Sequence, residues 1–149
     1  MRTILMAMAA AMLAGCGERA STMADINSTD VTLANGTKLV CQTMKEDIDL
    51  TRGLMFLDSL PPGHGMLFEY PLQRPHPAWM YQVKFAIDAI WMDNNHSIDQ
   101  MVLNIPPCIG HPAHECPHYG GDRNSSFMLQ APAGFVKQQG LKIGDRLDF

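Results

Sequence analysis

The feature that most constrains the fold of this chain is a short apolar segment near its amino end, residues 4–13, which follows a single positive charge at Arg2. This arrangement is typical of an export signal, which is removed and does not join the folded domain. The segment is well short of the roughly 20 apolar residues that a membrane-spanning helix needs. We therefore predict that residues 1–15 are a signal peptide and that the remaining chain folds in an oxidising compartment outside the cytoplasm.

A cysteine, Cys16, follows the apolar segment directly after the small residues Ala14 and Gly15. This ending resembles the bacterial lipobox, in which the cysteine is acylated and becomes the first residue of the mature chain. Each buried methylene contributes about 0.8 kcal/mol, so several acyl chains on Cys16 form a firm anchor in a lipid bilayer. In enteric bacteria an aspartate after the lipidated cysteine retains a lipoprotein in the inner membrane. Here Gly17 and Glu18 follow Cys16 instead, which favours a location in the outer membrane with the domain facing the periplasm. The alternative is an ordinary cleaved signal peptide with an incidental cysteine.

The rest of the chain divides into a tether and one domain. Residues 16–28 are polar and small, with no apolar period, which predicts a disordered tether. Residues 29–149 have the length of a single domain with one core. The formal net charge is -4 and no basic run is present, which argues against nucleic acid as a partner.

Short segments of strand pattern, separated by turn residues, dominate this domain. Asn35-Gly36 between two alternating segments predicts a tight hairpin, because both turn positions favour positive φ. Residues 46–52 predict a short helix ended by Gly53, and a second short helix after residues 131–133 is ended by Gly140. Residues 79–92, as one bent strand or two short ones, form with residues 98–105 a predicted hairpin central to the sheet. Residues 141–149 close the chain, with Gly144-Asp145 before a final predicted strand. We expect a mainly β domain with two short helices, arranged as a compact jelly-roll-like β-sandwich or a partly closed barrel.

Seven short segments together carry a resemblance to a known family. In chain order they are RGLMF (52–56), GMLF (65–68), WM (79–80), PPC (106–108), CPHY (116–119), PAG (132–134) and GLKIGDRL (140–147). In these segments the chain resembles the bacterial and archaeal family of domain of unknown function 192, over residues 31–149. The resemblance implies a compact jelly-roll-like β fold, often exported in bacteria, and it implies no reaction.

One segment departs from the family pattern. Members commonly carry an aromatic residue before Trp-Met and Lys-Asn-Thr after it, whereas here Ala78 precedes Trp79 and Tyr81 follows Met80. A binding chemistry that rests on this lysine cation is therefore not carried over to this chain.

A long loop, residues 106–125, gathers thiol and imidazole side chains. They are Cys108, His111, His114, Cys116 and His118. Such ligands could hold Zn or Cu, with His111, His114 and His118 as metal ligands. The competing interpretation is a Cys108–Cys116 disulfide, which the oxidising compartment favours and which contributes about 2.5 kcal/mol by loop closure. The family pattern has a cysteine at both positions and no comparable histidine cluster, which also favours the disulfide.

A polar pair is the candidate for a binding pocket. Asp88 interrupts an apolar strand, so its carboxylate needs a donor or solvent. Arg52 ends the first predicted helix, where a cation is favoured by the helix dipole and can also hold a carboxylate or phosphate. We hypothesise that Arg52 and Asp88 meet beside Trp79 and Met80, either as a structural ion pair or as the polar end of a shallow pocket. The hypothesis fails if the two side chains lie on opposite sides of the domain.

The remaining sulfur-containing residues have structural interpretations. Cys41 lies mid-strand, where an inert buried thiol is expected. The methionines of the domain are scattered singly among apolar neighbours, which favours core filling over a Cu(I) site. They are Met44, Met55, Met66, Met80, Met92, Met101 and Met128.

No catalytic signature accompanies these features. The sequence lacks a serine elbow, a His-Glu-x-x-His pair and a phosphate-cradling glycine loop. We therefore expect a non-enzymatic domain that binds an unknown small ligand or an envelope protein, with no cofactor. One alternative is a Zn or Cu protein, acting as a metal-assisted hydrolase or redox centre at residues 108–118. A second alternative is a structural envelope or assembly factor.

Overall fold

The computed structural model describes residues 27–149. The predicted signal peptide, the lipidation site Cys16 and nearly all of the tether lie outside the described residues. Among the described residues, no helix is long and apolar enough to cross a membrane.

The described chain is mainly β with two short α-helices, as predicted. Its elements are β1 (Ser28–Thr32), β2 (Lys38–Met44), α1 (Asp47–Arg52), β3 (His64–Pro75), β4 (Ala78–Trp79), β5 (Ile87–Met92), β6 (Ile98–Ile105), the 3-10 helix η2 (Ala113–Glu115), β7 (His118–Tyr119), β8 (Asn124–Pro132) and α2 (Phe135–Gln139). Six strands form one sheet in the order β1-β2-β3-β8-β5-β6, and β4 pairs with β7 in a separate two-stranded sheet. Only β2 and β3 run parallel in the large sheet, which is not closed into a barrel.

The first hairpin forms where its turn residues predict it. Gly36 has a φ of 85°, and the side-chain Oδ1 of Asn35 accepts a hydrogen bond from the Thr37 amide at 2.9 Å. The Leu33 amide donates to the Thr37 carbonyl at 2.8 Å and closes the turn. The helix ends are also as predicted, because Gly53 and Gly140 follow α1 and α2 with positive φ.

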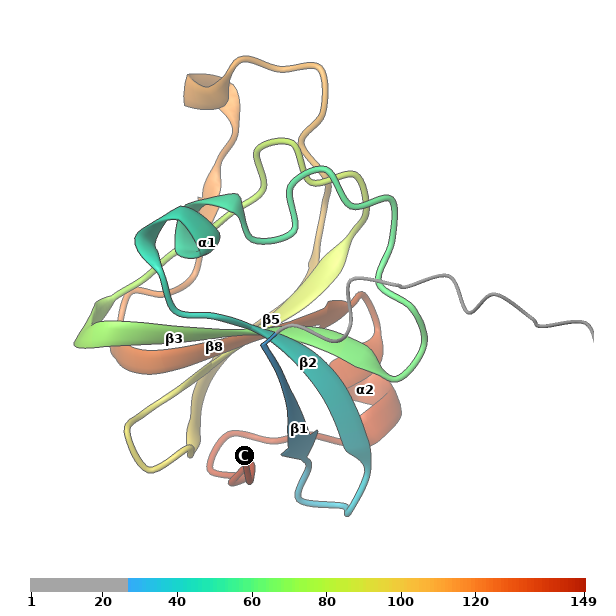
Figure 1. Cartoon of the computed structure of the whole chain (residues 1–149), viewed down its shortest axis with the longest axis vertical. Coiled ribbons are helices and arrows are strands. Elements are labelled where there is room, and N and C mark those ends of the chain that lie inside the picture. The colour runs from blue at the N-terminus through green and yellow to red at the C-terminus, as the bar shows by residue number, and fades with distance from the viewer. Residues whose placement is uncertain (1–26) are drawn as a thin grey trace, which may run out of the picture.

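The sheet separates two apolar cores, which we name the α1 face and the α2 face. Figure 1 shows α1 and the long loops on one side of the sheet, and α2 with the C-terminal segment on the other. All six residues of β5 are buried. Because side chains alternate along a strand, Ala89 and Trp91 pack into the α1 face whereas Ile90 and Met92 pack into the α2 face. Because both of its sides are buried, β5 contributes side chains to both cores.

Most of the methionines among residues 27–149 fill these cores, as expected. Of these seven, five are buried and two are half-buried. The buried ones are Met44, Met66, Met80, Met92 and Met128.

Two predictions about the sheet are wrong. The hairpin of β5 and β6 is not central, because β8 returns to pair with both β3 and β5 and leaves β6 at the edge. The final strand predicted after Gly144-Asp145 does not form, since this segment joins the sheet only through isolated bridges, Thr32 with Asp148 and Ser97 with Arg146. In both cases a pairing between distant segments overrides the local pattern.

Candidate functional site

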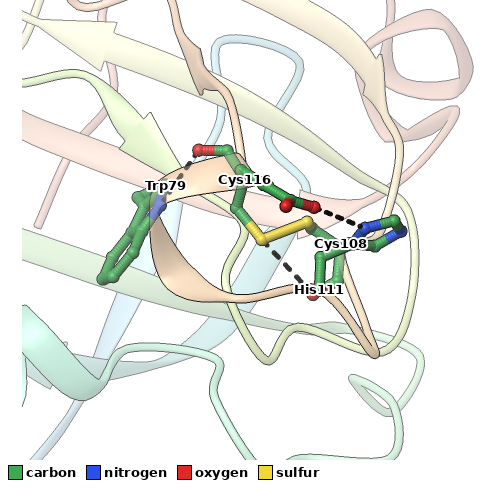
Figure 2. Close-up of a disulfide and its surroundings, with 5 residues drawn as sticks. Trp79, Cys108, His111 and Cys116 are labelled. Carbon is green, nitrogen blue, oxygen red and sulfur yellow. Dashed lines mark hydrogen bonds and ion pairs between the residues drawn. A yellow bond between two sulfur atoms is a disulfide. The ribbon is translucent and has the colours of Figure 1, made fainter.

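The long loop is closed by a disulfide, as predicted. Cys108 and Cys116 are bonded, with their Cα atoms 5.9 Å apart. The Cys116 carbonyl accepts a hydrogen bond from the indole Nε1 of Trp79 at 3.3 Å, and Figure 2 shows this contact beside the disulfide. Pairing of β4 with β7 holds the same two segments together, Trp79 opposite His118. The disulfide loop therefore fixes the position of Trp79.

Aromatic stacking also orients Trp79. Its half-buried ring stacks on Tyr81, with centroids 5.0 Å apart, and lies nearly parallel to His118 at 5.8 Å. The indole N–H is already bonded to Cys116, so Trp79 offers neighbouring groups its apolar ring rather than a donor.

The histidines of the loop do not gather into a ligand set. The His111 Nδ1 atom lies 3.3 Å from a Glu115 carboxylate oxygen, as Figure 2 shows, whereas the more exposed His114 is 4.0 Å from the other oxygen. His118 stacks on Trp79 instead. Within residues 27–149, no group of three or more His, Cys, Asp or Glu side chains is placed to hold a metal ion. The two cysteine sulfurs are bonded to each other, so the geometry offers no thiolate to Zn or Cu.

The hypothesis that Asp88 meets Arg52 is wrong. Asp88 is wholly buried, and its carboxylate accepts hydrogen bonds from the backbone amides of Asn104 and Val136, both at 2.9 Å. Val136 belongs to α2, so the carboxylate points to the α2 face, whereas Arg52 ends α1 on the other side of the sheet (Figure 1). The alternation of β5 explains this, because the neighbours of Asp88 on either side, Ile87 and Ala89, both face α1. Asp88 is a structural residue that ties β5 and β6 to the start of α2.

Arg52 and Trp79 do share a pocket, which we name the α1 pocket. It lies between α1, β3, β4 and β8 and has a volume of about 220 Å3. Besides these two residues its lining includes Leu50, Gly53, Leu54, Met55, Phe68, Tyr70, Ala78, Val83, Met128 and Gln130. Met80 is not among its lining residues, because this side chain is fully buried in the core below. Of the four pocket residues predicted from the sequence, the structure brings together Arg52 and Trp79.

The α1 pocket also contains a polar group that the sequence reasoning missed. Gln130 is only 5% exposed and lies on the same face of β8 as Met128. Its amide Nε2 reaches the Met128 sulfur at 3.8 Å, and a thioether is a weak acceptor. The available signal was an amide side chain directly after the apolar residues 127–129, two positions before Pro132.

A second hollow adjoins the α1 pocket and shares Leu50, Thr51 and Tyr70 with it. Its volume is about 280 Å3, and His76 and Arg74 line its other side. The rings of Tyr70 and His76 stack with centroids 3.6 Å apart. Burial raises the pKa of the Tyr70 phenol and lowers the pKa of the His76 imidazole, which favours the uncharged form of both rings.

Cys41 lines neither of these two hollows. It is fully buried in the α2 face, and burial raises the pKa of its thiol to about 12. The expectation of a buried thiol is confirmed.

Comparison with known proteins agrees with this architecture. No curated protein matches the chain. A protein of unknown function from Novosphingobium aromaticivorans DSM 12444 has a similar structure, with a TM-score of 0.71 and 19% identity, covering 82% of this chain and 85% of its own. A protein from Sinorhizobium meliloti 1021, described as a "putative transcription regulator", has a TM-score of 0.70 and 25% identity, covering 83% of this chain and 96% of its own. The family model of DUF192, described as "Uncharacterized ACR", matches residues 30–149. The chain therefore belongs to the DUF192 family.

Proposed function

We propose that this protein is an extracytoplasmic domain, anchored to the bilayer through acylated Cys16, that binds a small ligand in the α1 pocket without transforming it. The observation that carries this proposal is the convergence of family segments on one pocket. Three of the seven segments contribute to its lining: residues 52–55 from the first, Phe68 from the second and Trp79 from the third. These segments are distant in the sequence, and the fold brings them together around the same hollow.

The disulfide supports the proposed location. Disulfides form and persist in oxidising compartments and are rare in the cytosol. A bond between Cys108 and Cys116 therefore suits an exported domain. The segment that ends at Cys16 supplies both the export signal and the anchor.

The chemistry of the α1 pocket supports binding rather than catalysis. Its polar groups are the guanidinium of Arg52, the amide of Gln130 and the neutral hydroxyls of Thr51 and Tyr70. The Thr51 hydroxyl donates to the Asp47 carbonyl within α1 at 2.9 Å, so it is not activated by a base. The Cys41 thiol lies across the sheet with its pKa raised to about 12, so it supplies no thiolate at neutral pH.

The description of the Sinorhizobium relative does not transfer to this chain. Binding to nucleic acid depends on a concentration of positive charge that neutralises phosphates. This chain has a formal net charge of -4, and its lysines and arginines form no run. We therefore do not propose a role in transcription.

The anchor is tested on the full chain expressed in a Gram-negative host. Mass spectrometry of the mature amino terminus is expected to show acylated Cys16, and the protein is expected in the outer-membrane fraction. The Cys16→Ser variant is expected to leave that fraction. An unacylated amino terminus, or a wild-type protein recovered wholly in the soluble fraction, would overturn the anchor.

Ligand binding is tested by thermal-shift screening of the detergent-solubilised full chain against organic acids, amines, sugars and short peptides. Met55→Trp fills the α1 pocket, whereas Ile48→Trp adds the same side chain at an exposed position of α1 that does not line it. At least one compound is expected to stabilise the wild type and Ile48→Trp but not Met55→Trp. A blank screen together with an envelope protein crosslinked in cells would favour a structural envelope factor instead.

A further inference from the structure

We propose that the ligand of the α1 pocket is a small organic acid, whose carboxylate is held by Arg52 and Gln130 and whose apolar body lies against Trp79. This inference rests on the proposed function and names the chemistry of its ligand. Each part of the pocket constrains that chemistry separately.

The cation at the pocket has no partner of its own. Among residues 27–149, the Arg52 side chain makes no hydrogen bond and no ion pair, although it is the only lysine or arginine that lines the pocket. Among the other described cations, Lys45 pairs with Glu69 at 3.0 Å and Lys84 with Asp58 at 2.6 Å, whereas Arg74 in the neighbouring hollow makes no ion pair. A guanidinium presents two parallel N–H groups that match the two oxygens of a carboxylate. Arg52 therefore offers a fixed positive charge and a fork of donors at the pocket rim.

A second donor lies deeper in the pocket. The Gln130 side chain is nine-tenths buried, and its Nε2 has only the Met128 sulfur within reach among the described residues. Leaving a buried donor without a good acceptor costs about 1–3 kcal/mol. A ligand oxygen in the pocket removes that cost. Arg52 and Gln130 thus supply donors and no anionic acceptor, which is the pattern expected for an oxygen anion.

The remaining walls define the body of the ligand. Apart from Arg52, Gln130 and Thr51, the side chains that line the pocket are apolar or aromatic, including Phe68 and Trp79. A sugar would leave several hydroxyls without partners against such walls, which is costly. The volume of about 220 Å3 is below the roughly 300–1,000 Å3 of pockets for drug-sized ligands, so the body is a single ring or a short branched chain.

The charge of the anion follows from the number of donors. Phosphate groups carry up to two negative charges and three oxygens, and their sites commonly combine several amides or cations. This pocket provides one cation and one amide, together with the neutral hydroxyls of Thr51 and Tyr70 and no second cation. A carboxylate, with one charge and two oxygens, matches that set.

The test compares acids with neutral amides of the same shape. Titration calorimetry of the detergent-solubilised full chain uses benzoate, phenylacetate and isovalerate against benzamide, phenylacetamide and isovaleramide, with phenyl phosphate as a further probe. At least one acid is expected to bind about tenfold or more tightly than its amide, because the charge-assisted bonds to Arg52 are lost in the amide. Phenyl phosphate is expected to bind more weakly than benzoate.

Variants assign the effect to the two donors. Arg52→Gln is expected to abolish the preference for acid over amide, and Arg52→Lys to retain part of it, because lysine keeps the charge but not the fork. Gln130→Leu is expected to weaken acid binding several-fold. Arg74→Gln, which removes a cation from the neighbouring hollow and not from the α1 pocket, is expected to leave the preference unchanged. Thermal unfolding of each variant verifies that it is folded.

The outcomes separate this inference from the proposed function. Equal binding of acids and amides, tighter binding of phenyl phosphate, or a preference that survives Arg52→Gln would overturn the inference. Failure of every acid would overturn it as well. The proposed function fails only if the broader screen of amines, sugars and peptides is also blank.

Discussion

The two faces of the sheet differ in how their polar groups are satisfied. On the α2 face the buried carboxylate of Asp88 accepts two backbone hydrogen bonds, and the segment that follows α2 is bonded to the sheet through its backbone. On the α1 face loops cover the core, and Gln130 and Arg52 line a pocket with few partners of their own. The difference favours a structural role for the α2 face, and it agrees with the proposal that the α1 face binds a ligand.

The covering segments explain this division. The C-terminal segment lies along the α2 face through backbone bonds from Leu147 to His96 at 3.1 Å and from Asp148 to Thr32 at 2.9 Å. The α1 face has no comparable continuous ladder among the described residues. Its loops are held by the disulfide and by single contacts, such as the 2.7 Å bond from the Trp91 indole to the His76 carbonyl. The α1 pocket and the adjoining hollow lie where these loops are held at a few points. A hollow of about 340 Å3 also lies beside α2, lined by Phe135 and Gln138 and by no residue of the C-terminal segment.

The strongest challenge to this comparison is the removal of the buried carboxylate. Asp88→Ala leaves the amides of Asn104 and Val136 without acceptors, and we expect a loss of about 3–5 kcal/mol in the free energy of unfolding. Asp88→Asn keeps one acceptor and is expected to lose less. Urea denaturation of the purified protein measures both.

The matched control for this change is Asp58→Ala. Asp58 pairs with Lys84 at the surface, where ion pairs contribute little. If both alanine variants unfold at the same urea concentration, the structural role of Asp88 is wrong.

On the α1 face, close packing of the loops predicts a large effect at Gly121. This residue has a φ of 63°, and an added Cβ would lie 2.1 Å from the His76 carbonyl oxygen. Gly121→Ala is expected to cost about 3 kcal/mol from overlap and backbone strain together. Gly110→Ala, with a φ of 75° and open space around the Cβ, is expected to cost only the strain, about 1 kcal/mol. If thermal unfolding shows equal losses of stability for the two variants, the loop moves at His76 and removes the overlap.

The disulfide is expected to stabilise the α1 face in particular. Replacing Cys108 and Cys116 together by Ser is expected to lower the free energy of unfolding by about 2.5 kcal/mol, the loop-closure value for this short loop. Because Cys116 accepts the indole N–H of Trp79, the fluorescence of Trp79 should shift as well. Amide exchange in β1 and β2 should change little. If amide exchange becomes faster on both faces alike, the disulfide does not stabilise the α1 face in particular.

The smallest expected effect is a pH dependence from Cys41. The thiol pKa is raised from 9.0 to about 12 by burial, so the unfolded chain ionises first and stability falls as pH rises above 9. Between pH 9 and pH 10 the expected loss is about 1 kcal/mol. Cys41→Ala should remove this slope, and urea denaturation at the two pH values measures it. If the loss of stability between pH 9 and pH 10 persists in Cys41→Ala, another titrating group causes it.

Local sequence patterns predict a substantial part of this structure. Asn35-Gly36 predicts the first hairpin, Gly53 and Gly140 predict the helix ends, and the two loop cysteines predict the disulfide. Each of these depends on the conformational preference of a few adjacent residues or on the bonding of two nearby side chains. Such preferences act over short distances, and the tertiary structure leaves them unchanged.

The tertiary structure alone decides which face each strand residue occupies. Alternation shows that Asp88 and its neighbours point in opposite directions, but the direction of Asp88 depends on where α2 docks. The position of β8 between β3 and β5 likewise depends on pairings across more than 30 residues, and it places Gln130 in the lining of the same pocket as Arg52. The sequence by itself therefore determined the local turns, the bridged loop and the family, whereas long-range strand pairing decided the pocket.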